Sequence, residues 1–540
     1  MRLSLLLAGA INLVATQAIS ASRCTPETFT PHLSSNASLV YAVPYGPNDT
    51  FVGPLSNYTD LPEYCAVYVN VSSSATSSYE FGLWLPINNW NKRYIAYGNG
   101  GFTGMVQFSD MAPGLFYGFA TVSTNTGHNS SVTEAGVAPW ALNNPETRTD
   151  WGWRALHGSV DLGKDLTEAF YSEDISYSYY SGCSTGGRQG LKSVQMFPDD
   201  FDGVLAGACA WWTSHLQNWD LKVATYNLPN NGSHHITADQ IDVLADEVLR
   251  QCDGVDGVED KIIMNGYACN FRPEALLCDS PNANTSTCFT ADQIDTVYKI
   301  YSPWVETNDS FVFPSFAYGS ETQFSGMIIT ADEDEDAPSG IAYPRDFVYN
   351  DANWPWQNLD FSTIQLSDQL DPGNATADDF DLRPFQNRGG KLMHYHGFAD
   401  GEIPTGSSIY FYNQVLKALA PLGIQLDDFY RFFLIPGMEH CQDSVHDAPW
   451  YIASAMQPSS LTPSNVWSVP GFRDRKHDAV LALIAWVEEG IAPEELIATK
   501  FVDDDVSEGV QAQRRICVYP AEAKYVGGNW NETSSFECKY

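Results

Sequence analysis

The most constraining feature of the chain is a glycine-flanked serine that lies between a predicted strand and a predicted helix. Residues 182–187 read Gly-Cys-Ser-Thr-Gly-Gly, which matches the pattern G-x-S-x-G with Ser184 at its centre. Aromatic and β-branched residues over 174–180 predict a strand, and residues 188–197 predict a short helix. A strand, a sharp turn and a helix in this order are typical of a nucleophile elbow, which exposes a serine hydroxyl at the edge of a sheet.

The rest of the chain supplies the alternating elements that such an elbow needs. The sequence predicts helices over 153–171 and 478–490, where apolar residues follow helical spacing. Further strands are predicted over 65–71, 79–86, 93–97, 119–122, 201–208, 390–397 and 431–435. Strands that alternate with helices indicate a mostly parallel sheet covered by helices, so the sequence predicts an α/β fold.

The length of the chain indicates more than one structural unit. With 540 residues it exceeds the size at which a single hydrophobic core keeps growing. Residues 209–382 are rich in loops and contain few strands of period 2, so we expect an inserted, mainly helical lid domain there. The expected catalytic domain then comprises residues 22–208 and 383–540.

The N-terminus has the pattern of a secretory signal peptide. Arg2 provides a positive charge, residues 5–14 are apolar, and small residues follow up to Ala21. The apolar run is too short to span a bilayer, and ten N-x-S/T sequons occur along the chain. We therefore expect residues 1–21 to be a signal peptide and the mature protein to be a secreted, extracellular glycoprotein.

The acidic composition limits the partners that the chain can have. Its formal net charge at pH 7 is -38. Nucleic acids and anionic membranes both require a basic surface, so the sequence predicts neither as a partner. The simplest alternative interpretation of so many carboxylates is a well-solvated surface.

The eleven cysteines fit an oxidising compartment, and the odd number leaves one of them unpaired. Neighbouring cysteines suggest four local disulfides: Cys24–Cys65, Cys252–Cys269, Cys278–Cys288 and Cys517–Cys538. A fifth bond between Cys183 and Cys441 would place Ser184 beside His440 and would leave Cys209 free. No C-x-x-C spacing occurs, so we do not expect a zinc site.

Two loops after predicted strands carry the partners that a nucleophilic serine needs. A serine hydroxyl attacks only when a positioned histidine takes its proton, and an acid holds that histidine in the correct tautomer. Asp400 follows the strand that ends at residue 397, with Glu402 as the rival acid. His440 follows the strand over 431–435, with His446 as the rival base. The order Ser184, Asp400, His440 is the order of an α/β hydrolase.

An oxyanion hole requires backbone amides that point at the reacting carbonyl. The residue after the nucleophile, Thr185, is expected to provide one of them. The glycine-rich run 98–104 follows a predicted strand, so Gly100 and Gly101 are expected to provide the other. An ordinary glycine-rich turn is the alternative for this second segment.

Residues 252–263 form a second candidate site, inside the predicted lid. Asp253, Asp256 and Asp260 are separated by glycine-containing turns, and the backbone carbonyls of Val258 and Ile262 could complete an oxygen cage. Oxygen ligands of this kind suit Ca²⁺, although the spacing is not that of an EF-hand. The alternative is a plain acidic loop. From the residues alone both interpretations stay open, and a site inside the lid would have a structural rather than a catalytic role.

These motifs together resemble the tannase and feruloyl esterase family of secreted fungal enzymes. The family is marked by a Cys-Ser pair, an aspartate and a His-Cys pair, which here are Cys183-Ser184, Asp400 and His440-Cys441. The resemblance extends over nearly the whole mature chain and includes the glycine-rich run and the aspartate loop. It implies an α/β-hydrolase fold with a large inserted lid that binds calcium, and substrates that are esters of phenolic acids.

The function expected from the sequence is therefore that of a serine carboxylic ester hydrolase. We expect it to release ferulic, p-coumaric, caffeic or related acids from small phenolic esters or plant cell-wall conjugates through an acyl-enzyme. A tannase that hydrolyses galloyl esters is the alternative within the family. A secreted serine carboxypeptidase is a weaker alternative, because its elbow normally carries an acidic residue where Cys183 stands. A non-catalytic binding protein would be expected to lack a member of the triad.

Overall fold

The computed structural model describes residues 21–279, 286–307, 309–331, 334–464 and 466–540. The predicted signal peptide lies outside the described residues except for Ala21, as do the sequons at Asn284 and Asn308. Within the described residues, no helix is both long and apolar enough to cross a membrane.

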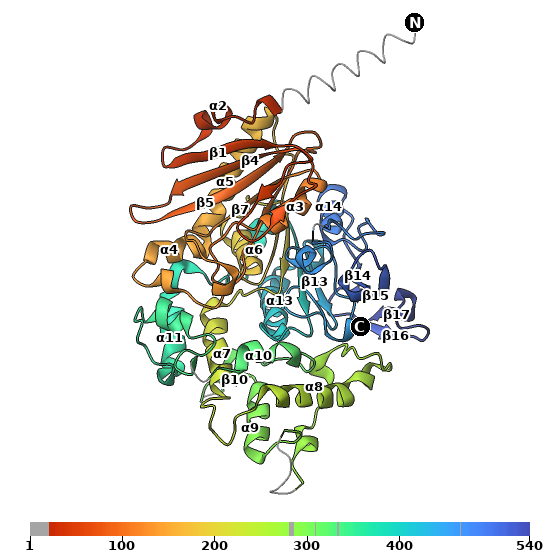
Figure 1. Ribbon diagram of the computed structural model, residues 1–540. Helices are drawn as coiled ribbons and strands as arrows, with labels where there is room; N and C mark the ends of the chain where they lie inside the picture. The colour runs from red at the N-terminus through yellow and green to blue at the C-terminus, as the bar shows by residue number, and fades with distance from the viewer. Residues whose placement is uncertain (1–20, 280–285, 308, 332–333, 465) are drawn as a thin grey trace.

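A large mixed sheet forms the centre of the described part of the chain (Figure 1). Its strand order is β1-β4-β5-β7-β6-β8-β9-β12-β13. The strands are β1 (Ala37–Tyr45), β4 (Tyr64–Ser72), β5 (Ser78–Pro86), β7 (Phe119–Thr124), β6 (Arg93–Tyr97), β8 (Tyr177–Cys183), β9 (Gly203–Gly207), β12 (Lys391–Gly397) and β13 (Tyr430–Ile435). The strands from β7 to β13 pair in parallel, and β1, β4, β5 and β7 pair antiparallel.

Side chains alternate between two hydrophobic cores along these strands, as the period of a strand requires. In β8, Tyr179 belongs to one core and Tyr180 to the other. The first core is covered by α3 (Phe108–Phe116) and α14 (Ala479–Glu489), and the second by α5 (Ala155–Tyr171), α6 (Thr185–Met196) and α13 (Thr405–Leu419). Helices on both faces of a largely parallel sheet confirm the α/β-hydrolase fold.

The segment between β9 and β12 contains a hydrophobic cluster of its own. The cluster draws on α7 (Thr213–Thr225), α8 (Ala238–Cys252), α9 (Ala291–Ile300), α10 (Phe324–Ile328) and α11 (Phe361–Leu370). Figure 1 shows α8, α9 and α10 toward the end of the molecule opposite β1, with α7 next to them and α11 on one flank. These helices lie within the lid, residues 209–382, whose boundaries stay a prediction from the sequence.

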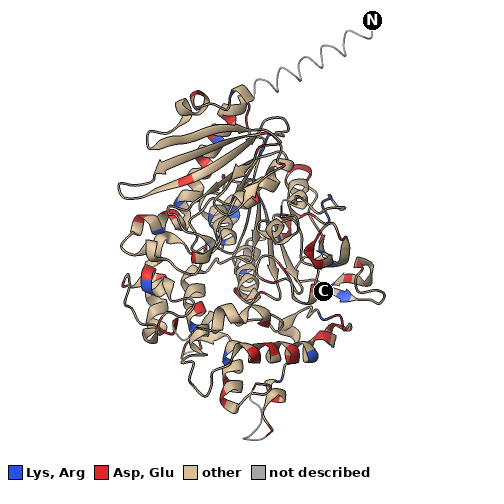
Figure 2. Ribbon diagram, viewed as in Figure 1, with Lys and Arg blue, Asp and Glu red and all other residues tan. Residues whose placement is uncertain are grey.

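The C-terminal part of the chain adds two antiparallel hairpins beside the sheet. They are β14 (Glu495–Phe501) with β15 (Val510–Cys517), and β16 (Glu522–Tyr525) with β17 (Phe536–Lys539). Acidic residues are spread over the molecule and include a row along α8 in the lid (Figure 2). The structure contains all five disulfides expected from the sequence and leaves Cys209, among the described cysteines, free and buried.

Candidate active site

Ser184 occupies the sharp turn between β8 and α6. Its backbone has φ 62° and ψ -124°, a conformation that non-glycine residues seldom adopt. The turn also brings the chain close to Gly98, where an added Cβ would lie 2.2 Å from the Tyr180 hydroxyl and 2.6 Å from the Gly186 Cα. The glycines on both sides of the serine and in the 98–104 run therefore allow two backbone segments to touch at the elbow.

Asp400 lies just beyond β12 and is completely buried. Its Oδ2 accepts a hydrogen bond from Nδ1 of His440 at 2.7 Å, and its Oδ1 accepts from the amides of Glu402 at 2.9 Å and Ile403 at 2.7 Å. Burial alone would raise the pKa of Asp400, but the neighbouring His440 and His396 hold it well below its usual value. Asp400 is thus an ionised acceptor aimed at His440.

The Cys183–Cys441 disulfide ties the elbow to the loop that carries His440. The two cysteine Cα atoms are 5.8 Å apart, although the cysteines are separated by 258 positions in the sequence. Cys183 immediately precedes Ser184, and Cys441 immediately follows His440. The bond consequently limits how far the serine and the histidine can separate, as the sequence predicted.

Two more carboxyl groups surround His440. Burial would lower the pKa of His440, but Asp400, Glu402 and Asp220 together raise it to about 9. Glu402, the rival acid, places Oε2 3.7 Å from Nε2 of His440, on the opposite side of the ring from Asp400. Burial raises the pKa of Asp220, on α7, well above its usual value, and its Oδ1 has no hydrogen-bond partner among the described residues.

Ser184 and His440 open into one cavity of about 350 Å³. Thr185, Gly100 and Gly101 line it as well, so the expected oxyanion donors lie around the same space. As the first residue of α6, Thr185 has an amide that no helical carbonyl can reach. Sequence analysis missed the lid side of the wall, which comprises Ala210, Leu216, Gln217, Asp220, Met327, Ser339 and Gly340. This volume is of the size that holds a small organic ligand.

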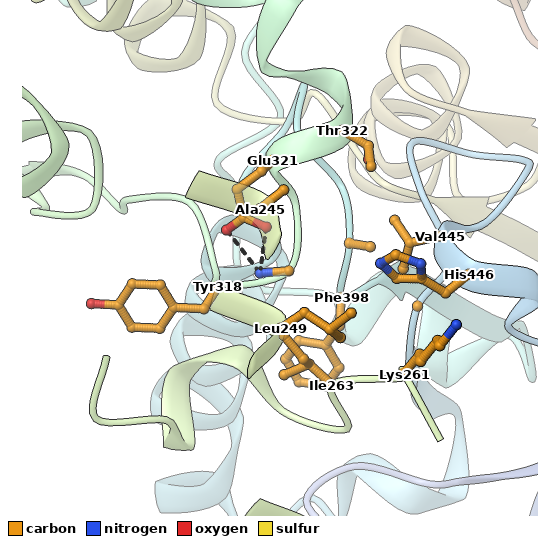
Figure 3. A pocket seen from close by; sticks show the side chains of 13 residues that line it. Ala245, Leu249, Lys261, Ile263, Tyr318, Glu321, Thr322, Phe398, Val445 and His446 are labelled. Atoms are coloured by element: carbon orange, nitrogen blue, oxygen red, sulfur yellow. Dashed lines mark hydrogen bonds between the residues drawn. The ribbon is translucent and has the colours of Figure 1, made fainter. Parts of the chain in front are cut away.

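The rival base His446 lies elsewhere. It lines a separate, small cavity between α8 and the loops after β12 and β13, together with Lys261 and Phe398 (Figure 3). This cavity has a volume of about 20 Å³, which is enough for a water molecule and too little for an aryl ester. Burial lowers the pKa of His446. The geometry therefore joins His440, and not His446, to the serine cavity.

Gln323 is a lid residue that sequence analysis did not identify. Its Oε1 accepts hydrogen bonds from the amide of Gly401 at 2.9 Å and from the amide of His440 at 3.1 Å. One lid side chain thus bridges the acid loop and the base loop. The neighbouring Glu321 is buried and accepts from the Gly319 amide (Figure 3), which anchors the turn that presents Gln323. No motif marks a glutamine of this kind in the sequence.

The aspartate loop in the lid is the segment for which the sequence predicts an oxygen cage. Among the described residues, no three acidic, histidine or cysteine side chains converge as a metal centre. Asp260 instead pairs with Arg514 at 2.6 Å. Asp256, however, has a buried Oδ2 without a hydrogen-bond partner in the described chain, and burial, with Asp260 and Asp253 nearby, raises its pKa to about 6. An uncompensated carboxylate of this kind fits a bound cation.

Comparisons with known proteins find relatives over nearly the whole chain. The family described as "Tannase and feruloyl esterase" matches residues 65–539. A curated relative, "Probable feruloyl esterase B-1" of Neosartorya fischeri, is 35% identical over 516 residues, covering 95% of this chain and 92% of the relative. The crystal structure of feruloyl esterase B from Aspergillus oryzae matches with a TM-score of 0.86 at 33% identity, covering 96% of this chain and 100% of that chain. The tannin acyl hydrolase from Aspergillus niger shares the fold, with a TM-score of 0.72 at 22% identity and coverage of 97% and 95%.

Proposed function

The chain belongs to the tannase and feruloyl esterase family of carboxylic ester hydrolases, and from that premise we propose that it releases phenolic acids from their esters through an acyl-enzyme on Ser184. Hydroxycinnamoyl esters are the proposed substrates, as the names of its relatives suggest. The observation that carries the proposal is the hydrogen bond of 2.7 Å between Asp400 and His440, beside the cavity that His440 shares with Ser184.

In the first half of the proposed reaction, Ser184 Oγ attacks the ester carbonyl while Nε2 of His440 takes the hydroxyl proton. Asp400 stabilises the imidazolium that forms and keeps Nδ1 protonated. The amides of Thr185 and of Gly100 or Gly101 donate to the carbonyl oxygen as it becomes negative. His440 then gives the proton to the departing alcohol, which leaves Ser184 acylated.

In the second half, water takes the place of the alcohol. His440 Nε2 accepts a proton from the water as the water attacks the acyl carbon, and the same amides stabilise the second oxyanion. Collapse of this intermediate breaks the bond to Ser184 Oγ, which regains its proton from His440. The products are a phenolic acid and the free enzyme.

Replacement of the serine tests this assignment. We expect Ser184→Ala to retain its fold by circular dichroism and to lose measurable hydrolysis of methyl ferulate, because no other group replaces the hydroxyl. Mass spectrometry of protein treated with a fluorophosphonate should find the adduct on Ser184. A Ser184→Ala protein that hydrolyses methyl ferulate at the parent rate would contradict the assignment.

Galloyl esters are the second candidate substrates, because the cavity wall carries acceptors for several phenolic hydroxyls. Gln217, Asp220 and Glu402 line the cavity, and a galloyl ring presents three hydroxyl donors. A comparison of kcat/KM for methyl ferulate and methyl gallate decides between the two. A higher value for methyl gallate would identify the chain as a tannase.

The proposal extends to a bound cation and to the location of the protein. Asp253, Asp256 and the carbonyls of Val258 and Ile262 would hold a structural Ca²⁺, while Asp260 is shared with Arg514. The five disulfides support an extracellular location with a cleaved N-terminus and glycosylated sequons. Plant cell-wall esters are then accessible substrates.

A further inference from the structure

A row of buried polar side chains extends from Asp400 into the core behind it. His394 and His396 lie on the same face of β12, two residues apart. Ser408 lies in the first turn of α13, and Tyr430 is the first residue of β13. All four have no exposed surface. They belong to the sheet and to the helix that covers it, and none of them lines the serine cavity.

These side chains form a continuous series of hydrogen bonds that ends on the acid. The Tyr430 hydroxyl is 2.8 Å from Nδ1 of His394, and Nε2 of His394 is 2.9 Å from Ser408 Oγ. Ser408 Oγ is 2.7 Å from Nδ1 of His396, and Nε2 of His396 is 2.9 Å from Oδ2 of Asp400. The last contact reaches the same carboxylate oxygen that accepts from His440.

The direction of donation is determined at the Asp400 end. Nε2 of His396 faces two acceptors, Asp400 Oδ2 and the carbonyl oxygen of Ile403, both at 2.9 Å, so this nitrogen carries a proton. With its proton on Nε2, the imidazole of His396 presents Nδ1 as the acceptor for the Ser408 hydroxyl, 2.7 Å away.

The other end of the series gives the same direction. Among the described residues, His394 Nδ1 is the one hydrogen-bond partner of the Tyr430 hydroxyl, so the hydroxyl donates to it. Burial lowers the pKa of His394 well below its usual value, which makes it neutral. His394 consequently donates from Nε2 to Ser408, and Ser408 donates to His396. Every proton in the series points toward Asp400.

We propose that His396 is a positioning residue of the esterase reaction, and that Tyr430, His394 and Ser408 hold it in the tautomer that donates to Asp400. The proposal rests on the catalytic roles proposed above for Asp400 and His440. Donors in a series polarise one another in a buried site, so each hydrogen bond strengthens the next. The last donor holds the Asp400 oxygen that orients His440, and without it the carboxylate gains a freedom that misaligns the base.

Four variants test the proposal by steady-state kinetics on methyl ferulate. We expect His396→Leu to lower kcat by about 10- to 100-fold with KM unchanged, because the lost bond is one to a charged group. His396→Gln, which keeps an N–H donor, should recover most of the loss. Ser408→Ala should reduce kcat by a smaller factor than His396→Leu, and Tyr430→Phe by a smaller factor still, because each breaks the series farther from Asp400.

Tyr395→Phe is a matched control, because it also removes a buried tyrosine hydroxyl from this sheet. Tyr395 lies on β12 but belongs to the opposite core, where its hydroxyl accepts from Ser454. We expect its kcat to equal that of the parent. A proton NMR spectrum gives a second readout, because the low-field resonance of the His440 Nδ1 proton should shift in His396→Leu and Tyr430→Phe and not in Tyr395→Phe.

The proposal is wrong if His396→Leu turns over at the parent rate, or if Tyr395→Phe loses as much kcat as Tyr430→Phe. If His396→Leu does not fold, the other two variants decide. The proposal is then wrong if Ser408→Ala and Tyr430→Phe both turn over at the parent rate and leave the His440 resonance unshifted. Ser184→Ala separates this failure from that of the proposed function. If Ser184→Ala is inactive and the His396 variants turn over at the parent rate, only the positioning role of His396 is refuted. If Ser184→Ala is active, the catalytic assignment of Ser184 is refuted.

Discussion

Asp400 beside the sheet and Asp256 in the lid are acidic residues of two tight loops with opposite surroundings. Asp400 accepts four hydrogen bonds, two on each carboxylate oxygen, from His440, His396 and two backbone amides. Asp256 accepts one, from the Val258 amide at 3.2 Å, and its other oxygen is buried without a partner among the described residues. The pKa of Asp400 is correspondingly held low, and that of Asp256 is raised by burial to about 6.

The two aspartates differ in how far protein donors satisfy their carboxylate oxygens. Both oxygens of Asp400 accept hydrogen bonds, whereas one oxygen of Asp256 accepts none among the described residues. Protein donors stabilise the charge of Asp400, so it can serve the base in every turnover without another partner. The charge of Asp256 has a single hydrogen-bond donor, the Val258 amide, so a bound cation would stabilise it further. The first arrangement is what a triad needs, and the second is what a structural metal site needs.

The sharpest way to break this comparison is to replace each aspartate by asparagine. We expect Asp400→Asn to lower kcat by about 10⁴-fold, because the amide no longer accepts the Nδ1 proton and the wrong histidine tautomer results. Asp256→Asn should keep the parent kcat and lose the stabilisation that calcium gives the folded protein. At a free calcium concentration of 100 times the Kd, that stabilisation is about 2.7 kcal/mol. Kinetics and melting curves with Ca²⁺ or a chelator measure the two effects.

Two outcomes would contradict this prediction. The first is an Asp256→Asn variant as inactive as Asp400→Asn. The second is a parent protein whose melting temperature does not change when calcium is removed, because the aspartate loop would then be a plain acidic loop. Wild-type protein with Mg²⁺ in place of Ca²⁺ serves as the control, since the smaller ion fits an irregular oxygen cage poorly.

The disulfides of the two regions give the second contrast. Removing Cys183–Cys441 by double alanine substitution should lower kcat by about 10-fold or more, because the bond constrains the distance between nucleophile and base. Removing Cys252–Cys269, which closes a separation of 17 residues beside the aspartate loop, should lower stability by about 3 kcal/mol and leave kcat unchanged. Equal kcat in both double variants would refute the catalytic role of the first bond. Non-reducing peptide mapping verifies each linkage.

The sequence predicted those parts of the fold whose residues carry a short-range pattern, such as a turn motif or a run of strand-forming residues. The elbow around Ser184 and the strands β4 to β9 carry short-range patterns, and the structure has them within a few residues of the predicted limits. The strand β1 and the helix α13 were not predicted. Four of the nine residues in β1 are exposed and none is fully buried, and the strand lies at the edge of the sheet, so its sequence lacks a clear alternation of apolar and polar residues.

The site shows the same division. Asp400 and His440 were predicted from their positions after strands, and the structure joins them by a hydrogen bond. Cys183 and Cys441 were predicted from their adjacency to the serine and the histidine, and the structure bonds them. Gln323, Asp220 and His396 were missed, because their roles depend on which segments the fold brings together. Gln323 belongs to the lid, more than 75 residues before either loop that it joins. No spacing rule along the chain reports a contact of that kind.

Glu402 gives the smallest expected effect, and it tests how far the catalytic region depends on charge alone. Its side chain is half exposed and lies 3.7 Å from Nε2 of His440, so its contribution is screened by water. It is one of the carboxylates that raise the pKa of His440 to about 9, against the effect of burial. Glu402→Gln should therefore lower this pKa by about one unit or less, the size of a Coulomb interaction at that distance in a water-like dielectric.

The sign of the effect follows from the role of the base. His440 must be neutral to take the serine proton, so kcat/KM rises with pH through the pKa of His440 in the free enzyme. A lower pKa moves the rising limb to lower pH, and Glu402→Gln should gain relative activity at acidic pH while losing none at high pH. Glu439→Gln is the control, because Glu439 precedes His440 in sequence but accepts a hydrogen bond from the hydroxyl of Thr322 in the lid. A rising limb that stays in place in Glu402→Gln, or that moves equally in Glu439→Gln, would show that Asp400 and burial alone set the basicity of His440.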